Sequence, residues 1–206
     1  EFGVLSAVCD TSSQRAKEFG KKYSVNFHSS FESLLEHEEF DAALVCTPTF
    51  THSDITKKLI ENKKHVFVEK PMTYLSEDGQ NLIDAAKRNN VILTCGYIER
   101  FNPAVASVKD FLKSQKYGDL IRLEFYREHR MPQHIKDVGV IYDTSVHDID
   151  TAMWLFDETP EIVFAIAGKI NHEHEDFATI TLGFKDNKTA TISSNWITPI
   201  RVRNFN

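Results

Sequence analysis

Two short segments of the sequence carry side chains that could hold a substrate oxygen or move a proton. In the first, Glu69-Lys70-Pro71, a carboxylate and an ammonium group follow an apolar run, and Pro71 fixes the turn. A lysine at such a place can donate a hydrogen bond to a substrate oxygen. The alternative is an ion pair on the surface at the end of a strand, and the segment alone is compatible with both.

The second segment contains Asp143 and His147, which are four residues apart. In a helix this spacing places both side chains on one face. An imidazole beside a carboxylate has the arrangement that a general base requires. The alternative is structural, with Asp143 capping the helix and His147 as a half-buried polar residue. We expect no metal here, because a single histidine gives too few ligands.

The lysine segment lies in a half of the chain that alternates apolar runs with amphipathic stretches. The apolar runs are expected to be fully buried strands, and they span 4–9, 41–46, 65–69 and 91–95, with a short additional strand at 24–28. The amphipathic stretches have helical periodicity, and they span 12–22, 31–37, 51–62 and 76–90. The alternation predicts an α/β fold with a doubly wound parallel sheet.

The pattern changes after residue 97, and we predict two domains, 1–97 and 98–206. Helices are expected at 103–116 and 141–156, so the second helix carries Asp143 and His147. Strands are expected at 120–130, 161–170, 177–184 and 188–197, with a hairpin turn at 185–188. The second domain is therefore predicted to be α+β, with antiparallel strands.

Asp10 is the candidate for holding the ribose of a dinucleotide. Parallel sheets bind ligands at the carboxyl ends of their strands, and an acidic residue there accepts hydrogen bonds from the adenosine ribose. Its carboxylate would repel a 2′-phosphate, so NAD is favoured over NADP. The alternative is that Asp10 caps the following helix. The glycine-rich loop that precedes such an acid by about 20 residues would fall before Glu1, so we expect a truncated chain.

Composition narrows the class of protein further. With 24 Lys and Arg against 30 Asp and Glu, the 206 residues carry a formal net charge of −6, which argues against a nucleic-acid partner. No apolar run reaches the roughly 20 residues that span a bilayer, so no membrane partner is expected.

Cys9, Cys46 and Cys95 are interpreted as reduced thiols of a cytoplasmic protein and as small apolar fillers under the cofactor site. The histidine-rich segment 171–176 is expected to be a solvated loop rather than a metal site.

Glu69-Lys70-Pro71 and Asp143-x-x-x-His147 together resemble the pattern of the glucose–fructose oxidoreductase, inositol dehydrogenase and MocA family of NAD(P)-dependent sugar oxidoreductases. Segments 8–10, 47–52, 96–103 and 143–150 agree in order, and 136–141, 147–150 and 194–203 resemble its UDP-N-acetylglucosamine 3-dehydrogenase branch. The resemblance implies a Rossmann-like N-terminal domain and a C-terminal domain with an open, mainly antiparallel sheet that pairs subunits into a homodimer or homotetramer. Both domains would then be incomplete here.

The resemblance also implies roles in oxidising a secondary alcohol of a sugar. His147 would accept the hydroxyl proton, Asp143 would orient His147 or the sugar, and Lys70 would hydrogen-bond the reacting oxygen while hydride passes to NAD. The residues implied in cofactor binding are Asp10, Thr47, Pro48, His52, Glu69, Lys70 and Arg100. A nucleotide sugar carries a diphosphate that needs cations, and the candidates are Arg130, Lys136, Arg201 and Arg203.

Two other functions fit the same residues. One is a regulator that binds a dinucleotide or a sugar, keeps the fold and has lost the reaction. The other is a dehydratase or glycosidase that uses NAD transiently. The presence of Lys70, Asp143 and His147 favours the dehydrogenase over the regulator, because a sensor does not need all three.

Overall fold

The first half of the chain alternates strands and helices, as the sequence predicts. The computed structural model describes residues 3–133, 135 and 137–206. The elements of this half are, in chain order, β1 (Ala7–Cys9), α1 (Ser13–Tyr23), β2 (Asn26–His28), α2 (Phe31–His37), β3 (Ala42–Val45), the 3-10 turn η1 (Thr49–Thr51), α3 (His52–Glu61), β4 (His65–Val68), α4 (Ser76–Asn89), β5 (Leu93–Cys95) and the 3-10 turn η2 (Ile98–Phe101).

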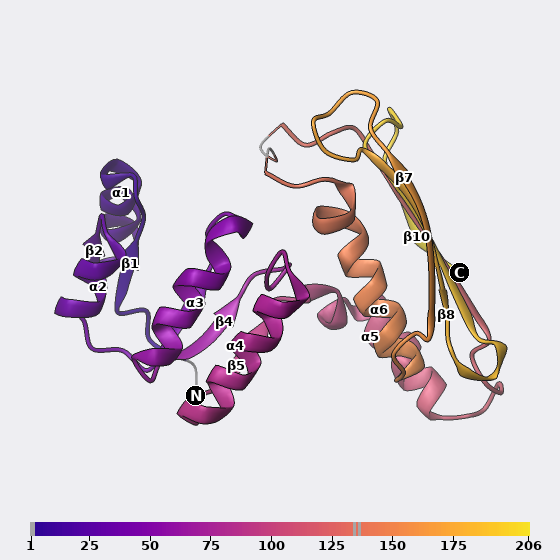
Figure 1. Ribbon diagram of the computed structural model, residues 1–206, viewed down its shortest axis with the longest axis horizontal. Coiled ribbons are helices and arrows are strands. Elements are labelled where there is room, and N and C mark those ends of the chain that lie inside the picture. Colours follow the sequence, from indigo (N-terminus) through magenta and orange to yellow (C-terminus); the bar gives the residue numbers. More distant parts are fainter. Residues whose placement is uncertain (1–2, 134, 136) are drawn as a thin grey trace.

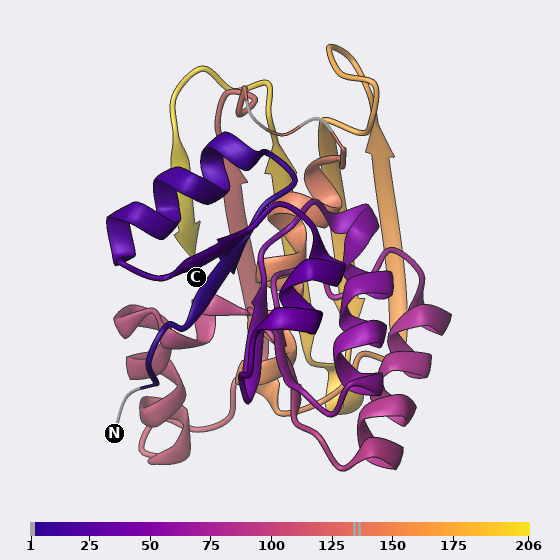
Figure 2. The ribbon, with the colours of Figure 1, turned by 90° about the vertical axis from the view of Figure 1, so that its left-hand side faces the viewer.

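The parallel strands of this half form two sheets instead of the one sheet that we expected. β1 pairs with β2, and β3, β4 and β5 pair in that order, all in parallel. Within the described residues, β1 and β3 therefore belong to different sheets. Figure 1 shows β1 and β2 with α1 and α2 at the left-hand end, beside α3, β4 and α4, and Figure 2 views the molecule from that end, with α1 in front. The predicted class, a Rossmann-like parallel fold, is confirmed.

None of these strands is fully buried, which corrects the expectation that they are, and the buried positions lie on β3 and β4. Val45, Val66 and Val68 pack against α3 and α4 in one apolar cluster, whereas Leu44, the neighbour of Val45, is 73% exposed. The reason is the alternation of side chains along a strand, since the helices cover the side that these valines face.

The cysteines follow the same pattern: Cys9 and Cys46 are exposed and Cys95 is half-buried, so their interpretation as buried fillers is wrong for the first two.

The second half forms one mixed sheet with helices on one face. Its elements are α5 (Pro103–Lys113), β6 (Arg122–Glu128), the π-helical turn η3 (Ile141–Ser145), α6 (Val146–Phe156), β7 (Ile162–Gly168), β8 (Phe177–Gly183), the 3-10 turn η4 (Lys185–Asn187), β9 (Thr189–Asn195) and β10 (Val202–Phe205). The strand order is β10-β6-β9-β8-β7. Only β6 and β9 pair in parallel, so the mainly antiparallel sheet and the β8–β9 hairpin are confirmed.

α5 and α6 cover the face of this sheet that points toward the N-terminal half, and the opposite face is open (Figure 1). The core between helices and sheet contains Phe125, Ile180, Ile192 and Trp196, all nearly inaccessible. The helix expected to reach residue 116 ends at Lys113, and β10 was missed because four residues show too little alternation.

A π-helical turn interrupts the helix that we expected over 141–156. Asp143 lies in η3, whereas His147 is the second residue of α6, whose C-cap Asp157 has a left-handed φ of 58°. Turns of this kind occur often at functional sites. In the part of the chain that the structure describes, no helix has the length and apolar character to cross a membrane.

Candidate active site

Lys70 reaches from the N-terminal half to the C-terminal half. It follows β4 by two residues, after Glu69 and before a cis Lys70–Pro71 peptide bond. Its Nζ atom donates hydrogen bonds to Oδ1 and to the backbone oxygen of Asp143, both at 2.8 Å. The two side chains are each 19% exposed, so this is a largely desolvated pair rather than a surface ion pair.

Further contacts across the two halves flank this pair. The Tyr74 hydroxyl donates to the backbone oxygen of Asp137 at 2.8 Å, and the Tyr142 hydroxyl donates to the backbone oxygen of Tyr74 at 3.0 Å. The backbone N–H of Thr49 donates to the Asp137 carboxylate at 3.3 Å. The position of Lys70 relative to η3 is therefore fixed by several hydrogen bonds.

Lys70, Asp143 and His147 line one cavity of about 150 Å³. The cations in its wall are Lys70, Arg127, Arg201 and Arg203. The other lining residues are His129, Asp143, Thr144, His147 and Val202. The cavity is thus lined by residues from separate elements: the turn after β4, β6, η3, α6 and the region of β10.

Asp143 holds Lys70 and does not hold His147. Its Oδ1 accepts from Lys70 and its Oδ2 accepts from the Thr144 hydroxyl at 3.2 Å, and no hydrogen bond to the imidazole is found within the described residues. Nδ1 of His147 is buried without a partner there. The implied role of Asp143 in orienting His147 is therefore corrected. The reason is that both carboxylate oxygens of Asp143 are engaged by other side chains, Oδ1 by Lys70 and Oδ2 by Thr144.

His147 is held in its neutral form by its surroundings. Burial is the largest cause, and together with the positive charges of Lys70 and Arg127 it lowers the pKa of the imidazole from 6.5 to about 4. Glu99 and Asp143 act against this by raising the pKa of His147. At neutral pH the imidazole therefore carries a free lone pair and can accept a proton.

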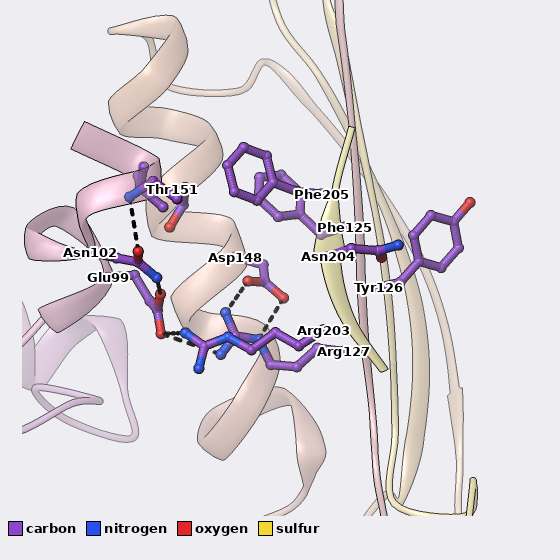
Figure 3. A pocket seen from close by; sticks show the side chains of 12 residues that line it. Glu99, Asn102, Phe125, Tyr126, Arg127, Asp148, Thr151, Arg203, Asn204 and Phe205 are labelled. Atoms are coloured by element: carbon purple, nitrogen blue, oxygen red, sulfur yellow. Dashed lines mark hydrogen bonds and ion pairs between the residues drawn. The ribbon is translucent and has the colours of Figure 1, made fainter. Parts of the chain in front are cut away.

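A second cavity, of about 310 Å³, is lined in part by a network of four charged side chains (Figure 3). Arg127 donates from Nε and Nη2 to both carboxylate oxygens of Asp148, at 3.1 and 2.5 Å, and from Nη1 to Glu99 at 3.4 Å. Arg203 also donates to Glu99. The network joins η2, β6, α6 and β10, and its two cations and two carboxylates balance.

Four residues of the two cavities were not among those predicted from the sequence: Arg127, His129, Glu99 and Asp148. One signal for Arg127 was present: along β6, Leu123 and Phe125 are buried, so the next residue of the same face is Arg127. A cation that continues a buried stripe is rarely left unpaired. Its partners could not be found from the sequence, since they come from distant elements.

The predicted ribose ligand Asp10 follows β1 and lies at the carboxyl end of that strand. Its Oδ1 accepts from the backbone N–H of Ser12 at 2.8 Å and from Arg15 at 3.1 Å. The N-cap of α1 is Ser12, whose hydroxyl accepts from the backbone N–H of Arg15. Asp10 thus supports the start of the helix without being its cap, and its carboxylate stays partly exposed.

Thr47 and Pro48 lie in the turn after β3, and the side chain of His52 contacts the backbone of that turn. The His52 ring is buried, with Nδ1 2.8 Å from the backbone oxygen of Pro71 and Nε2 2.9 Å from that of Thr47. Both ring nitrogens therefore face backbone carbonyls of the described chain. Direct contact of His52 with a dinucleotide does not fit this geometry. The ring instead ties the turn after β3 to the turn that carries Lys70.

Glu69 and Arg100 are also engaged within the protein. Glu69 Oε2 accepts from the backbone N–H of Lys70 at 3.2 Å and lies close to Gly96, where a Cβ atom would approach it to 3.1 Å. Arg100 forms a bidentate pair with Asp150 of α6 at 2.6 and 2.8 Å. Arg100 therefore fixes α6 from the side of η2 and does not line the cavity of His147.

The four cations proposed for a diphosphate fall into different places. Arg201 and Arg203 line the cavity of His147. Arg130 is exposed and does not line it, which corrects the expectation for this residue. Lys136 lies outside the described residues. Among the residues that the structure describes, Arg201 has no ion-pair partner, whereas Arg203 is paired with Glu99.

The histidine-rich segment 171–176 forms a bend between β7 and β8. Its last residue, Asp176, is buried and accepts hydrogen bonds from the backbone N–H groups of Ile170 and Asn171. The described residues contain no group of histidine, cysteine and acidic side chains that could hold a metal ion. Burial also raises the pKa of Cys95 to about 11, which keeps this thiol protonated.

The fold defines a two-part α/β protein, with a Rossmann-like N-terminal half and a C-terminal half built on one mixed sheet. Residues 2–97 match the family model described as "Oxidoreductase family, NAD-binding Rossmann fold", and residues 105–205 match the "GFO/IDH/MocA C-terminal domain". The chain belongs to the GFO/IDH/MocA family.

Individual relatives agree with this assignment. The chain is 34% identical over 156 residues to the scyllo-inositol 2-dehydrogenase (NAD(+)) of Bacillus subtilis, which covers 73% of this chain and 46% of the relative. It is 27% identical over 191 residues to the UDP-N-acetylglucosamine 3-dehydrogenase of Acidithiobacillus ferrooxidans. This match covers 93% of this chain and 59% of the relative.

A solved structure of the latter enzyme has a TM-score of 0.86 to this chain at 26% identity, and the match covers 98% of this chain and 65% of the solved chain. The chain therefore spans about half to two thirds of the length of the proteins that it matches.

Proposed function

We propose that this protein is an NAD-dependent dehydrogenase that oxidises a secondary hydroxyl of a sugar or nucleotide sugar. The observation that carries the proposal is the convergence of Lys70, Asp143 and His147 on one cavity, although they come from separate elements. An ammonium donor and a neutral imidazole at one cavity are what removal of a hydroxyl proton requires. The relatives named as dehydrogenases of an inositol and of a UDP-sugar support the substrate class.

Each of the three residues has one task in this proposal. His147 accepts the proton of the substrate hydroxyl, because burial keeps its imidazole neutral. Lys70 donates a hydrogen bond to the same oxygen and stabilises its developing negative charge. Asp143 fixes the Lys70 ammonium group by two contacts of 2.8 Å, so it acts as a positioning residue.

The carboxyl ends of the parallel strands offer groups that fit NAD. Asp10 presents acceptors for the adenosine ribose hydroxyls, and Glu69 does so for the nicotinamide ribose. The absence of a Cβ atom at Gly96 leaves the space that Glu69 occupies. Thr47 and Pro48 form the edge of the dinucleotide site. When bound, NAD accepts the hydride that the sugar carbon loses.

NADP is the comparison that a binding test must include. Arg15 contacts the Asp10 carboxylate, and arginine near this position can accommodate a 2′-phosphate. The carboxylate itself disfavours that phosphate, so the proposal keeps NAD as the preferred dinucleotide.

The charges in the wall of the cavity favour a substrate with an anionic group. Lys70 is paired with Asp143, and Arg127 and Arg203 are paired with Asp148 and Glu99. Arg201 adds a cation for which the described residues supply no carboxylate, so it is available to a phosphate or carboxylate of the substrate. Arg203 lies beside it and presents further donors to the same cavity.

The open face of the C-terminal sheet is proposed as a contact between copies of this chain. On β7, Ile162, Phe164 and Ile166 point away from the helices, and each is more than half exposed. Exposed apolar patches of this kind mark interaction sites. Self-association through this face would give the homodimer or homotetramer that the sequence suggests.

The test is the absorbance at 340 nm of the full-length protein with NAD and a panel of inositols, free sugars and UDP-sugars. Reduced nicotinamide with one class of substrate supports the proposal, and a preference for UDP-sugars supports the role of Arg201. Binding without reduction would favour a regulator. Product formation without net reduction would favour a dehydratase or glycosidase with transient redox chemistry.

A further inference from the structure

Glu175 caps the start of the helical segment that carries Asp143 and His147, although it comes from the bend between β7 and β8. The segment begins at Val140, whose backbone is already helical, with φ of −61° and ψ of −27°. The backbone oxygen of Glu175 accepts from the N–H of Val140 at 2.8 Å, and its Oε1 accepts from the N–H of Ile141 at 3.1 Å. The first N–H groups of a helix have no partner within that helix. Glu175 therefore satisfies two donors of the first turn.

Gly139, which directly precedes this segment, leaves the room that the Glu175 carboxylate occupies. A Cβ atom built on Gly139 would overlap that carboxylate, and its three nearest atoms all belong to Glu175. Among the glycines that the structure describes, only Gly118 has a positive φ, so the backbone conformation of Gly139 does not itself require glycine. The carboxylate is therefore the reason why a larger residue does not fit here.

The C-terminal sheet fixes the position of Glu175 through the next residue, Asp176, which is buried. The N–H of Asp176 donates to the backbone oxygen of Gly168 at 3.0 Å, and its own backbone oxygen accepts from the N–H of Trp196 at 2.8 Å. The Asp176 carboxylate also accepts from two backbone N–H groups of the bend. The side chain of Glu175 thus approaches the helix from a bend that is itself held in place.

Asp143 lies one turn into the segment that Glu175 caps. Its N–H donates to the backbone oxygen of Gly139 at 3.0 Å, so the first turn closes at the glycine beside the Glu175 carboxylate. The backbone oxygen and Oδ1 of Asp143 in turn accept from Lys70 Nζ, both at 2.8 Å. If this turn unwinds, both acceptors of the ammonium group move with it.

We propose that Glu175 is a positioning residue: by capping this turn it holds Asp143, and through Asp143 the ammonium group of Lys70. The inference rests on the proposed role of Lys70 as the donor to the substrate oxygen. Glu175 does not line the cavity of Lys70 and His147, so it acts through the helix and not on the substrate.

A cap with a purely structural role would behave differently when it is removed. Its loss would lower the free energy of unfolding and leave Lys70 unchanged in the molecules that stay folded. If the cap holds the Lys70–Asp143 pair, its loss releases the ammonium group within the folded protein. The reactivity of the Lys70 amine therefore separates the two explanations.

The experiment measures how fast an N-hydroxysuccinimide ester of acetate acylates Lys70 in the full-length protein, by mass spectrometry of its peptides. An amine that is held by two acceptors reacts more slowly than a free amine, since those hydrogen bonds must break first. Two other lysines serve as references in the same molecule. Lys57 is exposed and reports the activity of the reagent. Lys109 donates to the backbone oxygen of Trp154 in α6, so it reports unfolding of the C-terminal half.

The parent protein is compared with E175A, E175Q, G139A and the double variant G139A/E175A. E175A removes the side-chain acceptor, whereas E175Q keeps an oxygen that can accept from the N–H of Ile141. G139A displaces the carboxylate without removing it. The matched control is E173A, because Glu173 is an exposed carboxylate of the same bend.

Acylation of Lys70 relative to Lys57 should rise by about 3- to 10-fold in E175A and in G139A, the size expected from the loss of one helix cap. Lys109 should not change in either variant. E175Q should stay nearer to the parent protein than E175A, and E173A should equal the parent. The double variant should be no faster than E175A, since the added Cβ atom then meets no carboxylate.

A Lys70 rate in E175A that stays at the parent value would overturn the proposal. A parallel rise of Lys109 would also overturn it, because the change would then be general unfolding, and so would an equal rise of Lys70 in E173A. If E175A does not fold, G139A decides alone, and an unchanged Lys70 rate in that variant contradicts the inference.

The measurement uses neither substrate nor dinucleotide. Release of Lys70 in E175A, together with an absorbance panel that shows no reduction of NAD, would support the cap and reject the dehydrogenase. A failure of this inference is therefore distinguishable from a failure of the proposed function.

Discussion

Lys70 Nζ lies 2.8 Å from both Oδ1 and the backbone oxygen of Asp143, although 73 residues separate the two in the chain. The contact joins the turn after β4 to the π-helical turn η3. It therefore fixes the ammonium group relative to α6 and to His147. Because Asp143 uses its main chain and its side chain on the same partner, the two residues are expected to act as one unit.

Replacement of Lys70 by Met or of Asp143 by Asn should lower kcat by about 10²- to 10⁴-fold, because the donor to the reacting oxygen is removed or released. The double variant should be no worse than the poorer single variant, since residues that act as a unit are not additive. The matched control is Lys58→Met, which breaks an exposed ion pair with Glu32. Additive losses in the double variant would show that the two residues act independently.

His147 should make the protein more sensitive to acid. The folded pKa of about 4 lies below the ordinary value of 6.5, so between these values the unfolded chain binds a proton at this residue and the folded chain does not. Stability is therefore lost as the pH falls from 6.5 toward 4, by about 2 kcal/mol at pH 5 from this group alone.

Denaturant unfolding at pH 8 and pH 5 measures this effect as the difference between the parent protein and His147→Gln. The variant should lose less stability on acidification. An equal loss in both proteins would mean that the imidazole is protonated as easily in the folded as in the unfolded chain.

Arg201→Gln should raise KM for an anionic substrate by about 10- to 100-fold, because one charge-assisted hydrogen bond is lost. kcat should change little, since Arg201 is not assigned to the reacting oxygen. Arg130→Gln is the matched control: Arg130 is exposed and does not line the cavity. Steady-state kinetics of Arg201→Gln with a UDP-sugar and with a neutral inositol should show the rise in KM for the UDP-sugar only. An equal rise in KM in Arg130→Gln would contradict the proposed contact of Arg201 with the anionic group.

Phe164→Asp should dissociate the oligomer, because it places a charge on the open face of the sheet. Val163→Asp is the matched control, since Val163 is a similarly exposed neighbour on the same strand whose side chain points to the other face. Light scattering after size-exclusion chromatography gives the mass of each variant. Loss of association in both variants, or in neither, would place the contact elsewhere.

The parallel and antiparallel halves could be predicted because apolar runs and helical periodicity are local properties of the sequence. The positions of Lys70 and His147 at one cavity could be expected only through the resemblance to a family. The π-helical turn could not be read from the spacing of Asp143 and His147, because the sequence signal for an α-helix is the same over these residues.

Hydrogen-bond and ion-pair partners from distant elements could not be predicted from the sequence either. His52 looked like a residue that lines the dinucleotide, yet both of its ring nitrogens face backbone carbonyls of two different turns. The pairing of Arg100 with Asp150 was likewise not predicted, and its contact with the cofactor stays a prediction. Such pairings depend on tertiary packing, which periodicity and motifs do not encode.

The most direct test of the dehydrogenase account is a structure of the full-length protein with NAD and the substrate that the panel identifies. The account predicts that Lys70 Nζ and His147 Nε2 both lie within hydrogen-bond distance, about 3.2 Å or less, of the same substrate oxygen. An oxygen that contacts only one of these atoms, or a sugar bound away from both, would contradict it.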